Sequence, residues 1–250
     1  CMLRNTAGEY PRSTALIFGG ARIDYQELDL LVDRFACGLF DLGVRKGDRV
    51  ALLMPNCPKM IIAFYALFRM GAIAVPINPL YQEREIAYQI DNSGAETLIA
   101  LDILYPRISA RSDQTRLKTC VMTSIKDFLP PLKKMLYPLF QMKESHKVTK
   151  RGDLLHVEIK NLLKSGSSDY PPPDFLPGDV AILQYSGGTT GISKGAELTH
   201  GNIVSNTYQT TSWYYIIKRG EEIILTVLPL FHTYGIAVCM NLSIATASSM

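Results

Sequence analysis

Short apolar runs alternate with amphipathic segments along the first half of the chain, and no other feature constrains the fold as strongly. Runs of strand length lie at 49–54, 72–77, 97–101 and 120–123. Segments with apolar residues at helical spacing separate the first three of these runs, at 58–68 and 83–90. Strands that alternate with helices form parallel sheets that helices cover on both faces. The sequence therefore predicts an α/β fold with mostly parallel sheets flanked by helices.

Local signals mark the ends of the predicted helices. Asp24 and Glu27 form a D-x-x-E variant of the capping box, directly before a run of apolar residues at helical spacing. Pro58 suits the first position of the next helix, and Gly71 and Gly94 are typical of helix ends. These signals predict three helices between residues 24 and 94.

The alternation is lost between residues 125 and 178, where prolines, serines and basic residues are frequent. We therefore divide the chain into a first α/β subdomain (1–124), an irregular basic and proline-rich connection (125–178) and the start of a second α/β subdomain (179–250). In the last part the sequence predicts a strand at 179–186, a helix at 200–212, a strand at 223–228 and then a buried helix. Ligands of open α/β sheets bind beyond the carboxyl ends of the strands. We expect the polar loops after the two predicted strands to share one cleft.

The segment 185–200 reads YSGGTTGISKGAELTH and has the composition of a phosphate-binding loop. Its glycines let backbone N–H groups approach a ligand closely, its hydroxyl side chains add donors, and Lys194 adds a positive charge. The Walker A pattern is excluded because Gly195, not Ser or Thr, follows Lys194. The dinucleotide pattern G-x-G-x-x-G is excluded because the glycines lie at 187, 188, 191 and 195. A glycine-, serine- and threonine-rich surface turn is the alternative that composition alone leaves open.

The order of these sixteen residues resembles the phosphate-binding signature of the adenylate-forming superfamily, which includes acyl-CoA synthetases, adenylation domains and luciferases. The string is most similar to that of bacterial long-chain fatty-acid–CoA ligases. Two earlier segments, MPNCP at 54–58 and VPINPLYQEREI at 75–86, also resemble motifs of this family. The resemblance spans nearly the whole chain and is densest at 49–100 and 179–235.

The resemblance implies ATP-dependent conversion of a fatty acid to acyl-AMP, followed by thioester formation with coenzyme A. Negative charge develops on phosphate oxygens in the first step, so catalysis depends on positioning and electrostatic stabilisation. The positions that match the family's grip on the β- and γ-phosphates of ATP are Ser186, Gly187, Gly188, Thr189, Thr190, Gly191, Ser193 and Lys194. Of these, Lys194 and Thr189 are the expected catalytic residues.

A second matching motif is LPLFHTYG, at 228–235. Phe231 and His232 resemble the family's aromatic–histidine pair beside the acyl carboxylate, where an imidazole donates a hydrogen bond to the substrate. The resemblance makes His232 a catalytic candidate and puts Tyr234, Gly235 and Ile236 near the acyl pocket. A histidine whose hydrogen bonds are satisfied within the core is the competing interpretation.

Other motifs of the family have no match before Met250. They are the adenine- and magnesium-contacting string, the ribose-binding aspartate and the catalytic lysine of a small C-terminal domain. The chain thus resembles the first half of such an enzyme, and we expect the ligands of Mg²⁺ outside it. The 250 residues alone should show little or no ligase activity.

The five cysteines are scattered without a C-x-x-C pair, which favours a reducing, cytoplasmic location over a disulfide framework or a zinc site. No metal-ligand spacing is evident among the histidines. We therefore expect no metal site within these residues.

Charge is concentrated between residues 107 and 151, where eleven Lys or Arg stand against three Asp or Glu. Apolar residues lie among them, so this segment is suited to peripheral contact with an anionic membrane surface. The alternative is a surface excursion whose apolar side packs on its own domain. No nucleic-acid-binding motif accompanies the charge, so we expect no nucleic-acid partner.

Residues 223–250 carry no Asp, Glu, Lys or Arg, but Pro229 and Asn241 interrupt them, which favours buried elements over a membrane span.

Three functions stay open at this point. The first is a long-chain fatty-acid–CoA ligase whose partners are a fatty acid, ATP and coenzyme A. The second is another adenylate-forming enzyme, such as an aryl-CoA ligase or an amino-acid-adenylating domain. The third is a nucleotide- or membrane-binding module without catalysis. The sequence leaves open the acyl chain length and the oligomeric state, a homodimer included.

Overall fold

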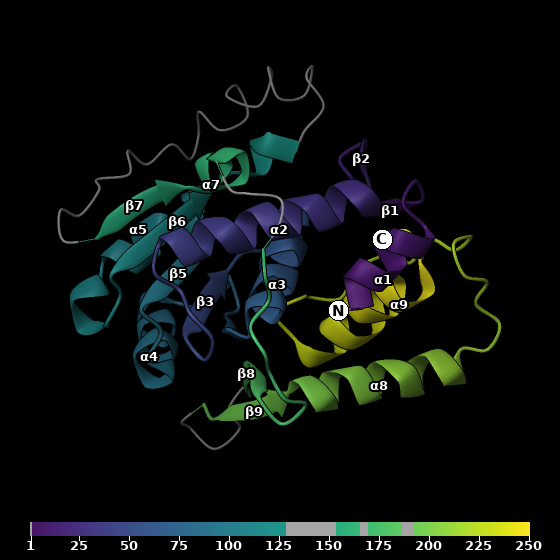
Figure 1. Ribbon diagram of the computed structural model, residues 1–250. Helices are drawn as coiled ribbons and strands as arrows, with labels where there is room; N and C mark the ends of the chain where they lie inside the picture. The colour runs from purple at the N-terminus through teal and green to yellow at the C-terminus, as the bar shows by residue number, and fades with distance from the viewer. Residues whose placement is uncertain (1, 129–153, 166–169, 187–192) are drawn as a thin grey trace.

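A computed structural model describes residues 2–128, 154–165, 170–186 and 193–250. Within these residues the larger sheet has seven strands in the order β7–β6–β5–β3–β4–β8–β9 (Figure 1). Their bounds are β3 (Arg49–Leu53), β4 (Ile73–Pro76), β5 (Thr97–Leu101), β6 (Thr119–Thr123), β7 (Leu155–Glu158), β8 (Val180–Tyr185) and β9 (Gly195–Thr199). Neighbouring strands are parallel except β8 and β9, which are antiparallel. The predicted α/β fold with a mostly parallel sheet is confirmed.

Helices lie on both faces of this sheet. α2 (Tyr25–Asp41) packs against both α3 (Pro58–Met70) and α7 (Ile159–Ser165), whereas α4 (Glu83–Ser93) packs against α5 (Tyr105–Ser109). The chain moves in one direction from β3 to β4 and returns past β3 to reach β5. Because such crossovers are right-handed, α3 and α4 lie on opposite faces (Figure 1). Short 3₁₀ turns occupy Asp102–Leu104, Ser112–Gln114 and Ile125–Phe128.

The two ends of the described chain lie side by side (Figure 1). The first elements are α1 (Met2–Glu9) and a hairpin of β1 (Thr14–Phe18) and β2 (Ala21–Asp24). The last elements are α8 (His200–Trp213), a π-helical segment Gly235–Asn241 and α9 (Leu242–Thr246). Backbone bonds join the ends: the Ile17 N–H donates to the Met250 oxygen at 2.7 Å, and the Met250 N–H donates to the Ala15 oxygen at 2.9 Å.

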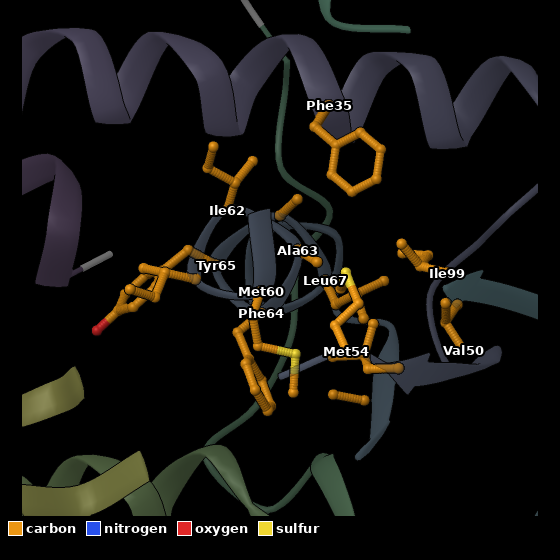
Figure 2. Close-up of a cluster of buried hydrophobic side chains, with 14 of the residues drawn as sticks. Phe35, Val50, Met54, Met60, Ile62, Ala63, Phe64, Tyr65, Leu67 and Ile99 are labelled. Carbon is orange, nitrogen blue, oxygen red and sulfur yellow. The ribbon is translucent and has the colours of Figure 1, made fainter. Parts of the chain in front are cut away.

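The core is built around α3, whose thirteen residues are all buried. A helix with apolar residues all round its surface is typical of a protein interior. In Figure 2, Phe64, Tyr65 and Leu67 point in different directions from α3. Phe35 approaches the helix from α2, and Val50 lies on the side of the sheet. α3 thus holds the sheet, α2 and the C-terminal elements together.

The charged side chains buried with α3 are paired. Arg69 forms ion pairs with Asp33, at 2.5 Å, and with Asp29. The more exposed Arg4 of α1 also contacts Asp29, at 2.7 Å. The side chains of Arg69 and Asp33 are only 3% and 4% exposed. Because an isolated charge is costly to bury, this network couples the folding of α1, α2 and α3.

The predicted helix ends are confirmed. The Asp24 carboxylate accepts a hydrogen bond from the Glu27 N–H at 2.7 Å and so caps α2. Pro58 is the first residue of α3. Gly71 and Gly94 follow α3 and α4 in the left-handed conformation, at φ 66° and 67°. Each signal works through neighbouring residues only, which is why the sequence revealed it.

The predicted strand at 223–228 is wrong. Among the described residues, one isolated bridge, Ile223 to Ser249, is the β-pairing of this segment. Its apolar side chains Ile223, Leu225 and Val227 are 71%, 79% and 69% exposed. The uncharged, apolar run suggested a buried strand, but a strand also needs a neighbour along its length to pair its backbone groups. The buried helix predicted after this segment is confirmed by α9 and the π-helical turn before it.

The structure differs from the sequence pattern in two further places. β7 and α7 lie within the stretch 125–178, where no regular element was predicted. β8 extends the sheet of the first part of the chain through its pairing with β4, Ala74 opposite Ile182. The subdomain boundaries at 124 and 178 remain a prediction.

The basic segment predicted for a membrane surface, 107–151, lies outside the described residues from 129 onward. Of the helices that the structure does describe, none has the length and apolar character needed to cross a membrane.

Candidate functional site

The glycine-rich loop is held at its base by the antiparallel strands β8 and β9. Tyr185 and Gly195 are the last paired residues, and the Ser186 N–H donates to the Lys194 oxygen at 3.0 Å. The Ser193 hydroxyl donates to the Ser186 oxygen across the same base. The predicted loop residues Gly187, Gly188, Thr189, Thr190 and Gly191 lie outside the described residues. The sequence did not predict β9. Because β9 follows the loop, the loop joins two strands rather than a strand and a helix.

Helix α4 supports the base of this loop from the side. The Tyr88 hydroxyl donates to the Ser193 oxygen at 3.1 Å, and the Tyr185 hydroxyl donates to the Asn92 side-chain oxygen at 2.7 Å. A Cβ at Gly195 would lie 3.1 Å from the Tyr185 ring, so the glycine permits this close approach. The base of the loop is therefore attached to the first part of the sheet and not only to its own hairpin.

Of the predicted phosphate-binding side chains, Lys194 is exposed and lies directly before the first residue of β9. An exposed ammonium group beside a glycine-rich loop suits a polyphosphate ligand. The Ser186 and Ser193 hydroxyls both bond to loop carbonyls, at Lys194 and Ser186 respectively. In this structure the two serines close the hairpin, and their role toward ATP remains a prediction.

His232 lies in a tight turn that begins at Pro229. The His232 N–H donates to the Pro229 oxygen at 3.1 Å, and the Ile236 N–H donates to the His232 oxygen at 3.1 Å. Gly235 packs on the same carbonyl so closely that a Cβ would lie 2.2 Å from the Pro229 oxygen. Pro229 and Gly235 thus set the backbone path that presents His232.

The imidazole of His232 is exposed and oriented by its own turn. Its Nδ1 accepts a hydrogen bond from the Tyr234 N–H at 3.3 Å. A nitrogen that accepts carries no proton in the neutral ring, so this bond assigns the proton to Nε2. With Nδ1 as an acceptor, Nε2 is the donor of the neutral ring, and the exposed His232 is not a histidine satisfied within the core.

A cavity of about 430 Å³ opens beside His232. It lies between the β8–β9 hairpin, α8 and the π-helical segment, which Figure 1 shows next to one another. Most of its lining is apolar, including Ile182, Ile203 and Ile236, and the imidazole of His232 provides a polar group. Polar side chains, among them Asn202, Asn206 and Asn241, also border it. A mainly apolar surface with polar groups at defined places is typical of sites for small molecules with an apolar part.

The other residues predicted near the acyl pocket are divided. Tyr234 and Ile236 line the cavity beside His232, and their role toward an acyl chain remains a prediction. Gly235 is buried behind it, and Phe231 is half-buried against the core. Phe231 therefore supports the turn in this structure, whereas Tyr234 and Ile236 face the cavity.

The strand before the glycine-rich loop is bonded to the turn that carries His232. Gln184 in β8 donates from its side-chain nitrogen to the Phe231 oxygen at 3.0 Å. This bond joins the strand that enters the glycine-rich loop to the turn that carries His232. The sequence analysis did not select Gln184; its signal was an amide side chain within an otherwise apolar strand, directly before the loop.

His200, the last residue of the sixteen-residue string, lies outside this cavity. It is the first residue of α8, and the capping side chain is that of Thr199, which accepts from the Asn202 N–H at 3.1 Å. The His200 ring stacks on Phe175 at 4.5 Å between centroids, and burial lowers the pKa of the imidazole. His200 is thus a packing residue.

Within the described ranges, no group of three or more His, Cys, Asp or Glu side chains is arranged to hold a metal ion. The described residues therefore identify no ligand for Mg²⁺, and its ligands are still expected outside this chain.

Comparison with known proteins gives consistent matches along the chain. The family model of AMP-binding enzymes matches residues 3–250. The long-chain-fatty-acid–CoA ligase of Bacillus subtilis is 36% identical over 252 aligned residues, which cover 100% of this chain and 45% of that protein. The corresponding ligase of Escherichia coli is 32% identical over 241 residues, 95% of this chain and 43% of that protein.

A solved structure agrees with these relatives. The crystal structure of a long-chain-fatty-acid-CoA ligase from Archaeoglobus fulgidus superposes with a TM-score of 0.79 at 25% identity, over 99% of this chain and 45% of that one. The chain thus spans a little less than half the length of the relatives it matches. Because the family model covers nearly all of the sequence and the fold agrees with this solved structure, the chain belongs to the AMP-binding enzyme family.

Proposed function

We propose that the full-length protein is a long-chain fatty-acid–CoA ligase, which activates a fatty acid with ATP to acyl-AMP and then forms a thioester with coenzyme A. One observation carries the proposal: an imidazole with a defined proton donor lies at an apolar cavity, next to the hairpin of the glycine-rich loop. A fatty acid has the matching chemistry, one anionic carboxylate on an apolar chain. The relatives named long-chain-fatty-acid–CoA ligase support the same substrate class.

His232 would orient the carboxylate in the first step. Its Nε2–H donates to one carboxylate oxygen, which leaves the other to attack the α-phosphorus of ATP. Because Tyr234 holds Nδ1 as an acceptor, the ring does not need to change tautomer for this task. The apolar cavity beside it would receive the first part of the acyl chain and exclude water from the carboxylate.

Lys194 would stabilise the polyphosphate. Its exposed ammonium group stands at the end of β9, where the glycine-rich loop returns to the sheet. Negative charge increases on the departing pyrophosphate, so a fixed cation there lowers the barrier. Magnesium would add further charge neutralisation; the residues that hold it are expected outside this chain.

The test is carboxylate-dependent exchange of labelled pyrophosphate into ATP by the full-length protein. Fatty acids of graded length, an aryl acid and a set of amino acids are compared at equal concentration. We expect exchange with long-chain fatty acids, and acyl-CoA formation when coenzyme A is added. Exchange that depends on the aryl acid or an amino acid would assign the protein to another adenylate-forming class, and exchange with none of them would reject the proposal.

A further inference from the structure

The turn between β3 and α3 sends one side chain across the molecule to the segment that carries His232. Asn56 is the central residue of MPNCP, and its side-chain nitrogen donates to the Thr226 oxygen at 3.1 Å and to the Leu228 oxygen at 2.8 Å. Its side-chain oxygen accepts from the Leu230 N–H at 2.9 Å. One amide group therefore binds three backbone groups about 170 residues away in sequence.

We infer that Asn56 is a positioning residue for His232. The inference rests on the proposed function, because it concerns the residue assigned there to orient the carboxylate. Nothing in the chemistry of acyl transfer requires Asn56 to touch the substrate. It acts through the backbone between Thr226 and His232.

The geometry explains how the effect reaches the imidazole. The three bonded residues, 226, 228 and 230, occupy alternate positions of the segment that leads to His232, and their backbone polar groups all face the Asn56 amide. Pro229 lies between two of them, and the Pro229 oxygen is the acceptor for the His232 N–H at 3.1 Å. The peptide that starts the His232 turn is thus held on both sides by Asn56.

Asn56 replaces a neighbouring strand. Residues 223–228 have, among the described residues, one isolated β-bridge, at Ile223. An amide side chain offers two N–H donors and a carbonyl acceptor, which are the groups that an adjacent strand would provide. An aspartate in the same place would have the size and shape but no donors, and its charge would face two carbonyl oxygens.

The surrounding prolines make Asn56 a rigid support. Pro55 and Pro58 flank it by one and two residues, and Pro58 begins α3. Cys57 between Asn56 and Pro58 is extended, at φ −160° and ψ 161°, as a residue before proline prefers. Little conformational entropy is lost when this turn aims the amide, because its backbone is already restricted.

Gln184 holds the same turn at a second point, through its bond to the Phe231 oxygen. That bond comes from β8, and the Asn56 bonds come from the end of β3. The His232 turn is thus attached both to strand β8 and to the turn that follows β3. We expect Asn56 to contribute more, since it makes three of the four bonds.

The test uses the full-length protein and the exchange assay described above. Asn56→Asp should lower the fatty-acid-dependent kcat by about 10- to 100-fold, the size expected when a reacting group is displaced by about 1 Å. The KM for ATP should stay within about twofold, because Tyr88 and Asn92 hold the phosphate loop independently of Asn56. A kcat equal to that of the unmodified protein would overturn the inference.

The matched control is Asn78→Asp, the same substitution in the half-buried turn after β4. The Asn78 side-chain oxygen accepts from the Leu80 N–H at 2.9 Å, and an aspartate keeps that bond. We expect exchange within about twofold of the unmodified protein. A loss as large as that of Asn56→Asp would mean that any added charge near this sheet edge is harmful, and the inference would fail.

A double-mutant cycle separates positioning from a general loss of structure. In a His232→Ala background, Asn56→Asp should lower kcat by a further factor of less than about two, because there is no imidazole left to position. In a Lys194→Ala background, Asn56→Asp should still lower kcat by about 10- to 100-fold. Equal costs in both backgrounds would contradict the inference.

Hydrogen–deuterium exchange gives a readout that does not depend on activity. In Asn56→Asp, peptides that cover 224–232 should exchange faster, because the carboxylate repels the Thr226 and Leu228 oxygens and no longer holds the segment, while peptides from α4 should not change. If the aspartate variant does not fold, Asn56→Ser, which is smaller and uncharged, takes its place. If no fatty acid supports exchange in the unmodified protein, the proposed function fails, and this measurement still decides whether Asn56 holds the segment; unchanged protection at 224–232 would reject it.

Discussion

Gly235 provides the sharpest test of how the His232 turn is built. A Cβ at this position would lie 2.2 Å from the Pro229 oxygen, 2.7 Å from the Pro229 carbonyl carbon and 3.0 Å from the Leu228 oxygen. All three contacts are with backbone, which has no flexible end that could move aside. In a close-packed interior the two segments would have to separate by about 1 Å to admit a methyl group.

The expected effect of Gly235→Ala follows from that displacement. Inserting a methyl group into a well-packed site costs about 1–3 kcal/mol of unfolding free energy. The same shift carries the Pro229 oxygen away from the His232 N–H, to which it is bonded at 3.1 Å. A displacement of about 1 Å at a reacting group lowers the rate by about 100-fold, so we expect a loss of that size in fatty-acid-dependent exchange.

The assays are urea unfolding and pyrophosphate exchange of the full-length protein, with Gly8→Ala as the control. Gly8 lies in α1, and a Cβ there would have no atom within 4 Å. Alanine should stabilise that helix by up to about 1 kcal/mol and leave exchange unchanged. Unaltered stability in Gly235→Ala would refute the steric reasoning, and reduced stability with a normal rate per folded molecule would refute the link to His232.

Three further predictions concern other parts of the molecule. Lys194→Ala should reduce the rate of adenylation by about 10- to 1000-fold, as expected for loss of one charge-stabilising group, and an unchanged exchange rate would remove Lys194 from the mechanism. Arg69→Met should lower the unfolding free energy in urea by about 3–5 kcal/mol, because it leaves the buried Asp33 carboxylate with its partner Arg4 alone, and a loss below about 1 kcal/mol would contradict this. Burial lowers the pKa of His200, so the stability it contributes is complete above the unfolded pKa of about 6.5 and is lost as the pH falls through the folded pKa. His200→Phe, which retains the stack on Phe175, should lose less stability than the unmodified protein as the pH falls below about 6.5, and equal losses in urea unfolding would contradict the assignment.

The order of strands and helices between residues 24 and 101 was predictable because both periodicities are local, whereas α1, β1 and β2 before them were not predicted. β5 begins and ends at the predicted residues, Thr97 and Leu101. The caps at Asp24, Gly71 and Gly94 also depend on residues within one helical turn. The short, partly exposed strand β9 was missed because its residues were assigned to the loop motif, and a strand of that composition is recognised only by its partner β8.

The two halves of the candidate site differ in the same way. The glycine-rich string and the Phe231-His232 pair were visible as motifs, because their chemistry is carried by residue type and spacing. Their support was not visible. Asn56 and Gln184 are ordinary amides in the sequence, and their function as supports depends on carbonyl groups that folding brings to them.

The sequence by itself thus determined the class of fold and the family, and it provided the residues that we propose to contact phosphate and carboxylate. These depend on short patterns that any segment carries with it. The tertiary structure alone decided that the loop is closed by an antiparallel strand, that residues 223–228 remain without a continuous partner strand in the described chain, and that a tautomer-defined His232 borders an apolar cavity. Each of these depends on contacts between segments far apart along the chain. At residues 226–230, for example, the Asn56 side chain forms hydrogen bonds of the kind that a neighbouring strand would form.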